Sequence, residues 1–279
     1  MTWRQWAWSS IIVFGVAAGC SDAPTDTDVE TLVVVQAYLY AGEPVSDVRL
    51  TASVPLGSDS TDAPPINDAD VVLYRNGQAY RLTPADTDGM YVYTGTDLTI
   101  AAGDTFRIEV TYNGTVVSGE TVVPEPPQHV AISSSTLVVP DFTWQPSGGG
   151  PPPAMDSAQV VVSWANPDRA LHYVVVRGPA EGSDPIFPED FGPGGPFSRF
   201  RMITQPTADD YYSVGMQTLR DLGRHEAIVY RVNKEYADLY ENRTQDSRDL
   251  TEPPTNIRNG LGVITAFNSR VVYFDVVRN

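Results

Sequence analysis

The sequence is poor in cysteine and histidine, and this limits the chemistry that it can support. Cys20 is the only cysteine among 279 residues, so no disulfide can form within the chain and the fold must rest on a hydrophobic core. The three histidines, His129, His172 and His225, lie far apart in the sequence, and no second cysteine can join them in a zinc site. We therefore expect no metal and no cofactor.

Positive charge is also scarce. Lysine occurs once, at Lys234, and 18 basic residues stand against 35 acidic ones, which gives a formal net charge of −17. Proteins that bind nucleic acids present a basic patch to the phosphate backbone. The charge balance of this chain therefore excludes nucleic acid as a partner.

Familiar catalytic motifs are missing as well. The sequence contains no G-x-S-x-G elbow and no P-loop. His225–Glu226 begins like the zinc motif H-E-x-x-H, but Val229 stands where the second histidine would be. Residues 86–89 (DTDG) look like half a calcium loop without its downstream glutamate, and a hairpin turn explains them. The sequence predicts a protein that is not an enzyme.

No apolar run reaches the roughly 20 residues that a membrane-spanning helix needs. Residues 11–20 (IIVFGVAAGC) form a short apolar core followed by three small residues and Cys20. This pattern resembles the lipobox of bacterial lipoprotein signal peptides. The resemblance implies a signal peptide at 1–19, lipid attachment at Cys20 and an acidic tether at 20–30. A secreted protein without lipid and a membrane-spanning anchor are the alternatives.

Residues 31–123 alternate between apolar and polar side chains and are rich in β-branched and aromatic residues. Asn76–Gly77 and Asn113–Gly114 each separate two such runs, and Asn-Gly favours a tight hairpin because both residues tolerate positive φ. Regularly spaced strands without a helical segment predict a β-sandwich. The expected strands are 32–40, 48–54, 71–74, 79–82, 90–93, 98–100, 106–112 and 116–123.

Residues 124–127 (PEPP) cannot continue a sheet and are expected to form a stiff spacer. A second β-rich unit, 128–279, follows. Its segments 159–164 (QVVVSW) and 172–177 (HYVVVR) are expected to pair as a hairpin, with a long insertion at 178–205 and a short helix at 234–241. The predicted fold class is all-β, with two consecutive immunoglobulin-like β-sandwiches.

Several motifs carry a family resemblance. Residues 69–73 (ADVVL), 88–91 (DGMY) and 103–110 (GDTFRIEV) are similar to a transthyretin-like sandwich. Residues 219–229 (LRDLGRHEAIV) resemble the approach to strand F of a fibronectin type III domain, with His225 in the position of its corner tyrosine. From the first strand to residues 256–262 (NIRNGLG), the mature chain resembles a family of Bacteroidota lipoproteins, domain of unknown function 4249.

These features favour a lipid-anchored, non-catalytic binding or assembly module. The resemblance implies an outer-membrane location, facing the periplasm or the surface, and a receptor or transporter as partner. A structural spacer and a hydrolase with two carboxylates across a cleft are the alternatives, and the oligomeric state stays open. Aromatic side chains in the insertion are candidate partner contacts, although they could instead cap the second sandwich. These side chains are Phe187, Phe191, Phe197 and Phe200.

Overall fold

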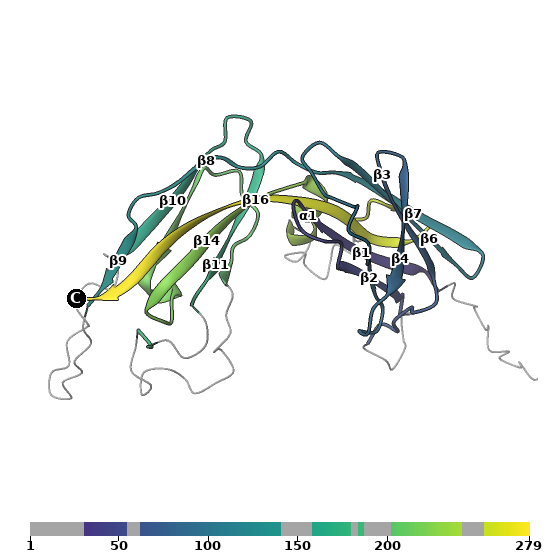
Figure 1. Cartoon of the computed structure of the whole chain (residues 1–279), viewed down its shortest axis with the longest axis horizontal. Helices are drawn as coiled ribbons and strands as arrows, with labels where there is room; N and C mark the ends of the chain where they lie inside the picture. Colours follow the sequence, from purple (N-terminus) through teal and green to yellow (C-terminus); the bar gives the residue numbers. More distant parts are fainter. Residues whose placement is uncertain (1–30, 55–61, 141–157, 180–183, 187–201, 242–253) are drawn as a thin grey trace, which may run out of the picture. The chain divides into compact units, whose positions relative to one another are not determined.

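The computed structural model describes residues 31–54, 62–140, 158–179, 184–186, 202–241 and 254–279. These residues lie mostly in strands, which confirms the predicted all-β class (Figure 1). The elements are β1 (Val33–Tyr40), β2 (Asp47–Ala52), β3 (Asp70–Arg75), β4 (Gln78–Pro84), β5 (Met90–Val92), β6 (Thr105–Tyr112), β7 (Thr115–Val122), β8 (Gln128–Ile132), β9 (Thr136–Val139), β10 (Gln159–Ala165), β11 (Leu171–Arg177), β12 (Met202–Ile203), β13 (Tyr211–Gly215), β14 (Gly223–Val232), α1 (Lys234–Glu241), β15 (Ile257–Arg258) and β16 (Leu261–Arg278).

The first sandwich is built from strands β1 to β7. Strands β1, β2 and β5 pair in one layer and β3, β6 and β7 in the other, while β4 pairs with β3 and then with β5. The turns Asn76–Gly77 and Asn113–Gly114 have positive φ at both residues, as their sequence predicts. Segment 98–100 forms no strand, contrary to expectation, yet Leu98 and Ile100 are buried in the core from an irregular backbone.

Strand β16 belongs to both sandwiches. Residues 261–267 pair in parallel with β1, and residues 267–276 pair with β14 in antiparallel register. Strand β15 adds to β7, and the side chains of Ile257, Ile264 and Ala266 lie in the core of the first sandwich. The structure therefore adds a C-terminal segment to the first sandwich, whereas the boundaries drawn from the sequence gave residues 128–279 wholly to the second.

The second sandwich packs a three-stranded sheet, β8-β10-β13, against the strands β12-β11-β14-β16, with β9 on β16. Strands β10 and β11 lie in different sheets, so the expected hairpin between them is wrong. Trp164 is buried in the core between the sheets. The short helix at 234–241 is also confirmed, and it follows β14 directly.

Candidate functional site

The residues singled out from the sequence for partner contact and lipid attachment lie outside the described part of the chain. This applies to Cys20 and to the four phenylalanines of the insertion, Phe187, Phe191, Phe197 and Phe200. Within the described residues, no three His, Cys, Asp or Glu side chains lie close enough together to hold a metal ion. The same residues include no helix long and apolar enough to cross a membrane.

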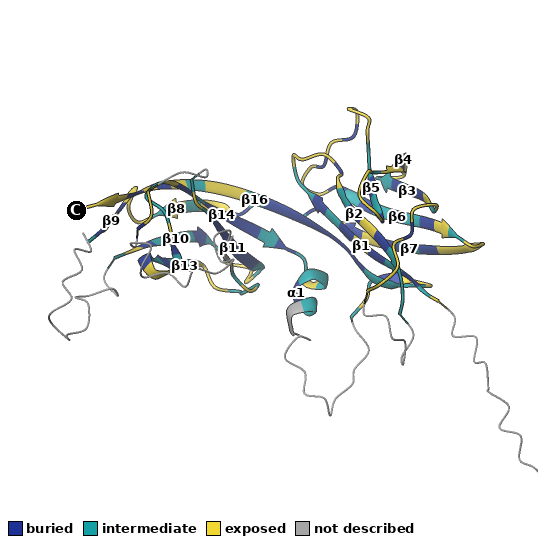
Figure 2. Ribbon diagram, turned by 90° about the horizontal axis from the view of Figure 1, so that it is seen from below, coloured by how far each residue is buried: buried dark blue, intermediate teal, exposed yellow. Residues whose placement is uncertain are grey.

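An aromatic cluster lies where β16 passes from β1 to β14. The ring of Phe267 is 4.9 Å from Tyr40 and 4.8 Å from Tyr236 between centroids, and it also contacts the rings of Tyr38, Tyr173 and Tyr230. These residues lie on β1, β11, β14, α1 and β16. Strands β11 and β14 are therefore buried on both faces, one in the sandwich core and the other in this cluster (Figure 2).

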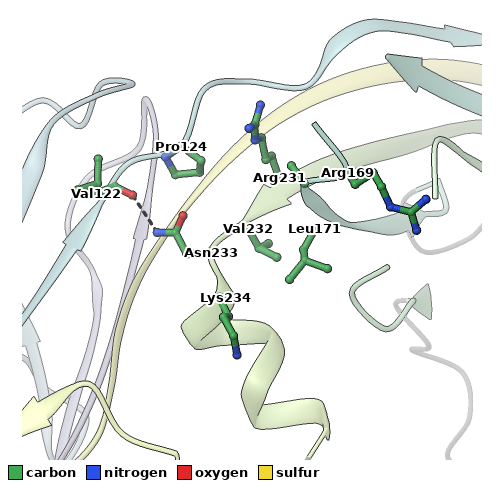
Figure 3. Close-up of a pocket in the computed structure, with 9 residues that line it drawn as sticks. Val122, Pro124, Arg169, Leu171, Arg231, Val232, Asn233 and Lys234 are labelled. Carbon is green, nitrogen blue, oxygen red and sulfur yellow. Dashed lines mark hydrogen bonds between the residues drawn. The ribbon is translucent and has the colours of Figure 1, made fainter. Parts of the chain in front are cut away.

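A hollow of about 390 Å³, which we call the junction hollow, lies beside this cluster. Figure 3 shows Arg231, Arg169 and Lys234 on different sides of the apolar residues Leu171 and Val232. The lining contains no acidic residue, so the site is locally cationic in an acidic chain. Its lining residues are Val122, Pro124, Arg169, Ala170, Leu171, Arg231, Val232, Asn233 and Lys234.

Two cations of the junction hollow form ion pairs with carboxylates just outside it. Arg231 pairs with Asp168, and Lys234 pairs with Asp238 one turn along α1. Burial by itself would raise the pKa of Asp168, but the charge of Arg231 and the hydrogen bonds from its guanidinium and from nearby backbone amides together outweigh this effect, and the pKa of that carboxyl is lowered. One member of each pair is well exposed to solvent, Asp168 in the first and Lys234 in the second, and pairs in contact with solvent contribute little to stability.

Asparagine side chains fix the strands around the junction hollow. The amide of Asn233 donates to the carbonyl of Val122 at 2.8 Å and to the hydroxyl of Thr121 at 2.9 Å (Figure 3). The amide of Asn268 donates to the carbonyl of Pro124 at 2.9 Å. These hydrogen bonds tie the end of β7 and the segment that follows it to the residue after β14 and to the middle of β16. The hollow is therefore preformed.

The segment NIRNGLG, which carried the family resemblance, has a structural role. Asn256 donates from its amide to the carbonyl of Ile264 at 2.8 Å and accepts from the Ile264 amide at 3.0 Å, so one side chain imitates a strand partner. Gly262 has φ of +106°, and a Cβ there would lie 1.9 Å from the carbonyl oxygen of Val35. Only glycine allows β16 to approach β1 this closely.

His172 and His225 lie in the core of the second sandwich and not at a site. Each ring donates from Nδ1 to a nearby carbonyl, Ala170 at 2.9 Å and Gly223 at 3.0 Å. Burial lowers the pKa of both imidazoles. The H-E segment lies on β14.

An exposed apolar strip runs along the outer face of β16 and β9. Tyr273 is 45% exposed, and the guanidinium of Arg224 lies 4.4 Å from its ring centroid. Isolated exposed apolar residues are ordinary, but neighbouring ones on a single sheet face are typical of contact surfaces. The apolar members of the strip are Val138, Val271, Tyr273 and Val277.

The sequence reasoning missed the junction hollow. Its signal was available in part, because Arg231 and the single lysine, Lys234, are three residues apart in a chain that is short of positive charge. Arg169 lies far away in the sequence, and only the pairing of β11 with β14 brings it to the same place. In the sequence, the apolar lining residues Leu171 and Val232 cannot be distinguished from residues of an ordinary core strand.

Comparison with curated proteins found no match. Among solved structures, the chain is similar to the crystal structure of chicken CNTN1 FN1-FN3 domains, at 10% identity and a TM-score of 0.23. That similarity covers 73% of this chain and spans 59% of the other. A family model described as a domain of unknown function, DUF4249, matches residues 21–271. The chain therefore belongs to the DUF4249 family.

Proposed function

We propose that the protein is a lipid-anchored component of the cell envelope that acts as a non-catalytic binding or assembly module. Its place would be the outer membrane, where it would be accessory to a transporter or a surface complex. The observation that carries the proposal is the shared strand β16, which completes the first sandwich with residues 261–267 and the second with residues 267–276. Because one strand contributes to both cores, the two sandwiches form a single scaffold.

A scaffold of this kind suits assembly because it holds separate surfaces at fixed positions. The junction hollow and the apolar strip on β16 and β9 are two such surfaces. The hollow has no lining carboxylate and no histidine beside a nucleophile, so its chemistry suits binding better than proton transfer. The lipobox-like segment ending at Cys20 supports attachment to a membrane.

Affinity purification of the tagged chain from detergent-solubilised envelope tests the proposal. We expect an outer-membrane protein to co-purify in stoichiometric amount, and we expect Cys20→Ser to give an unprocessed precursor or a released protein that no longer recovers it. A Cys20→Ser protein that matures and fractionates with the outer membrane would contradict the anchor. Purification of the wild-type chain without any partner would favour the structural spacer.

The insertion is tested in the same experiment. Phe191→Ser combined with Phe197→Ser removes two large apolar side chains from the sequence-predicted contact region. A contact surface should lose its partner and keep its melting temperature. A cap on the second sandwich should instead lose about 3–5 kcal/mol of stability per buried phenylalanine.

A further inference from the structure

The junction hollow combines positive charge with an apolar floor, and this combination selects a type of ligand. We propose that it is an anion site that takes a carboxylate on a short apolar stem, as an acidic residue of a partner polypeptide presents one. The inference rests on the proposed function, because it names the contact that a partner would make.

Charge is the first argument. The chain has a formal net charge of −17, and its overall field therefore repels anions. Any anion site must gather cations locally, and three of the nine residues that line the hollow are basic while none is acidic. Asp168 and Asp238 pair with Arg231 and Lys234 from outside the lining.

Arg169 is the cation that a ligand would meet first. Its side chain is exposed, and the described part of the chain gives it no ion pair. Its backbone has φ of +51°, in the left-handed region that residues other than glycine and asparagine seldom adopt. The hydrogen bond from the Arg169 amide to the Asn166 carbonyl, 3.2 Å long, holds this turn and sets Arg169 at the rim.

The floor supplies the second half of the recognition. Val232 is buried, Leu171 is half-buried, and Pro124 closes the side opposite Arg169 (Figure 3). A volume of about 390 Å³ falls within the range of small-ligand pockets. Apolar surface beside a cationic rim would bind an amphiphilic anion better than inorganic phosphate, since it can cover the stem as well as the charge.

The geometry does not have to be assembled by the ligand. Asn233, next to Val232, already binds the carbonyl of Val122, and Asn268 already binds the carbonyl of Pro124. A preformed site loses little conformational freedom on binding. A single carboxylate can therefore bind there with measurable affinity.

Hexanoate is a suitable probe, with hexanamide as its uncharged counterpart. The detergent-purified chain is melted in increasing hexanoate, with ionic strength held constant by sodium chloride, and its intrinsic fluorescence is followed. We expect hexanoate to raise the melting temperature in a saturable way and hexanamide to leave it unchanged, because only the ligand-bound folded state gains free energy. No rise at 100 mM hexanoate, or an equal rise with hexanamide, would overturn the proposal.

Two variants locate the effect. Arg169→Gln should weaken hexanoate binding at least tenfold and keep the melting temperature measured in chloride alone. Arg258→Gln removes the same charge from an exposed position on β15, away from the hollow, and should bind hexanoate like the wild type. Equal binding by both variants would place the anion elsewhere and refute the site.

The same variants separate this inference from the proposed function. If Arg169→Gln loses hexanoate and its envelope partner together, the hollow is the contact. If the variant loses hexanoate and still recovers the partner, the partner docks on another surface. In that case the claim about the partner fails, while the proposed function stands.

Discussion

Phe267 lies at the point of β16 where the two sandwiches meet. It is 1% exposed, it ends the register of β16 with β1, and it begins the register with β14. Its ring contacts five tyrosine rings, with centroid separations from 4.8 to 6.3 Å. We predict that Phe267→Ala destabilises the chain and also lets the sandwiches unfold separately.

The expected loss follows from the packing. Truncation of a buried phenylalanine to alanine costs about 3–5 kcal/mol, the larger values applying where the surroundings cannot collapse into the space. Aromatic pairs contribute about 0.5–1.5 kcal/mol beyond the area that they bury. Five tyrosine rings held by several different elements cannot close the cavity together, so we expect about 5 kcal/mol.

Calorimetry and urea unfolding followed by tyrosine and tryptophan fluorescence measure both effects. The wild type should unfold in one transition, and Phe267→Ala in two. Phe274→Ala is the matched control, because Phe274 is also 1% exposed on β16 but stacks on His225 inside the second core. Phe274→Ala should destabilise the second sandwich by a similar amount and leave the contacts between the two sandwiches intact. One transition in Phe267→Ala, with a loss under about 1 kcal/mol, would refute the reasoning.

Three further outcomes are expected. Residues 31–123 expressed alone should stay molten, with weak near-ultraviolet circular dichroism, because their core lacks the side chains that β15 and β16 supply; a cooperative melt would contradict this. Gly262→Ala should prevent folding of the first sandwich, seen as lost amide-exchange protection in β1, since the added Cβ meets a β1 carbonyl. Stability should fall as pH drops below about 6.5, because burial lowers the pKa of His172 and His225 and the unfolded chain therefore takes up more protons than the folded one. The free energy of unfolding should decrease by up to about 1.4 kcal/mol per pH unit for each of these two histidines. Urea titrations from pH 7.5 to 5.5 measure this slope, which the double substitution of His172 and His225 to asparagine should flatten.

The local signals in the sequence were sufficient for most of the strands. Asn-Gly pairs fixed two hairpins because positive φ at both residues is a property of the turn itself. The short helix was visible in the spacing of its apolar residues. Turns and short helices of this kind depend on neighbours within a few residues, so they can be predicted directly from the sequence.

Pairing between distant segments was harder to predict. Strands β10 and β11 are separated by a short loop, which fits a hairpin as well as a crossing between two sheets. The run of five buried residues in β11, from His172 to Val176, was the better signal, because a strand with one face in water would alternate. The length of β16, 18 residues, likewise reflects that this strand belongs to both sandwiches.

The family motif now has a physical meaning that bears on function. Asn256 holds β16 beside β7, and Gly262 lets β16 approach β1, so the NIRNGLG segment serves the closure of the first sandwich. In this chain the segment serves the architecture, and we look for binding specificity in residues outside it. Arg169 and Lys234 are such residues, because neither contributes to a core cluster. A relative that keeps the closing segment but replaces these two cations should fold in the same way and fail to bind hexanoate.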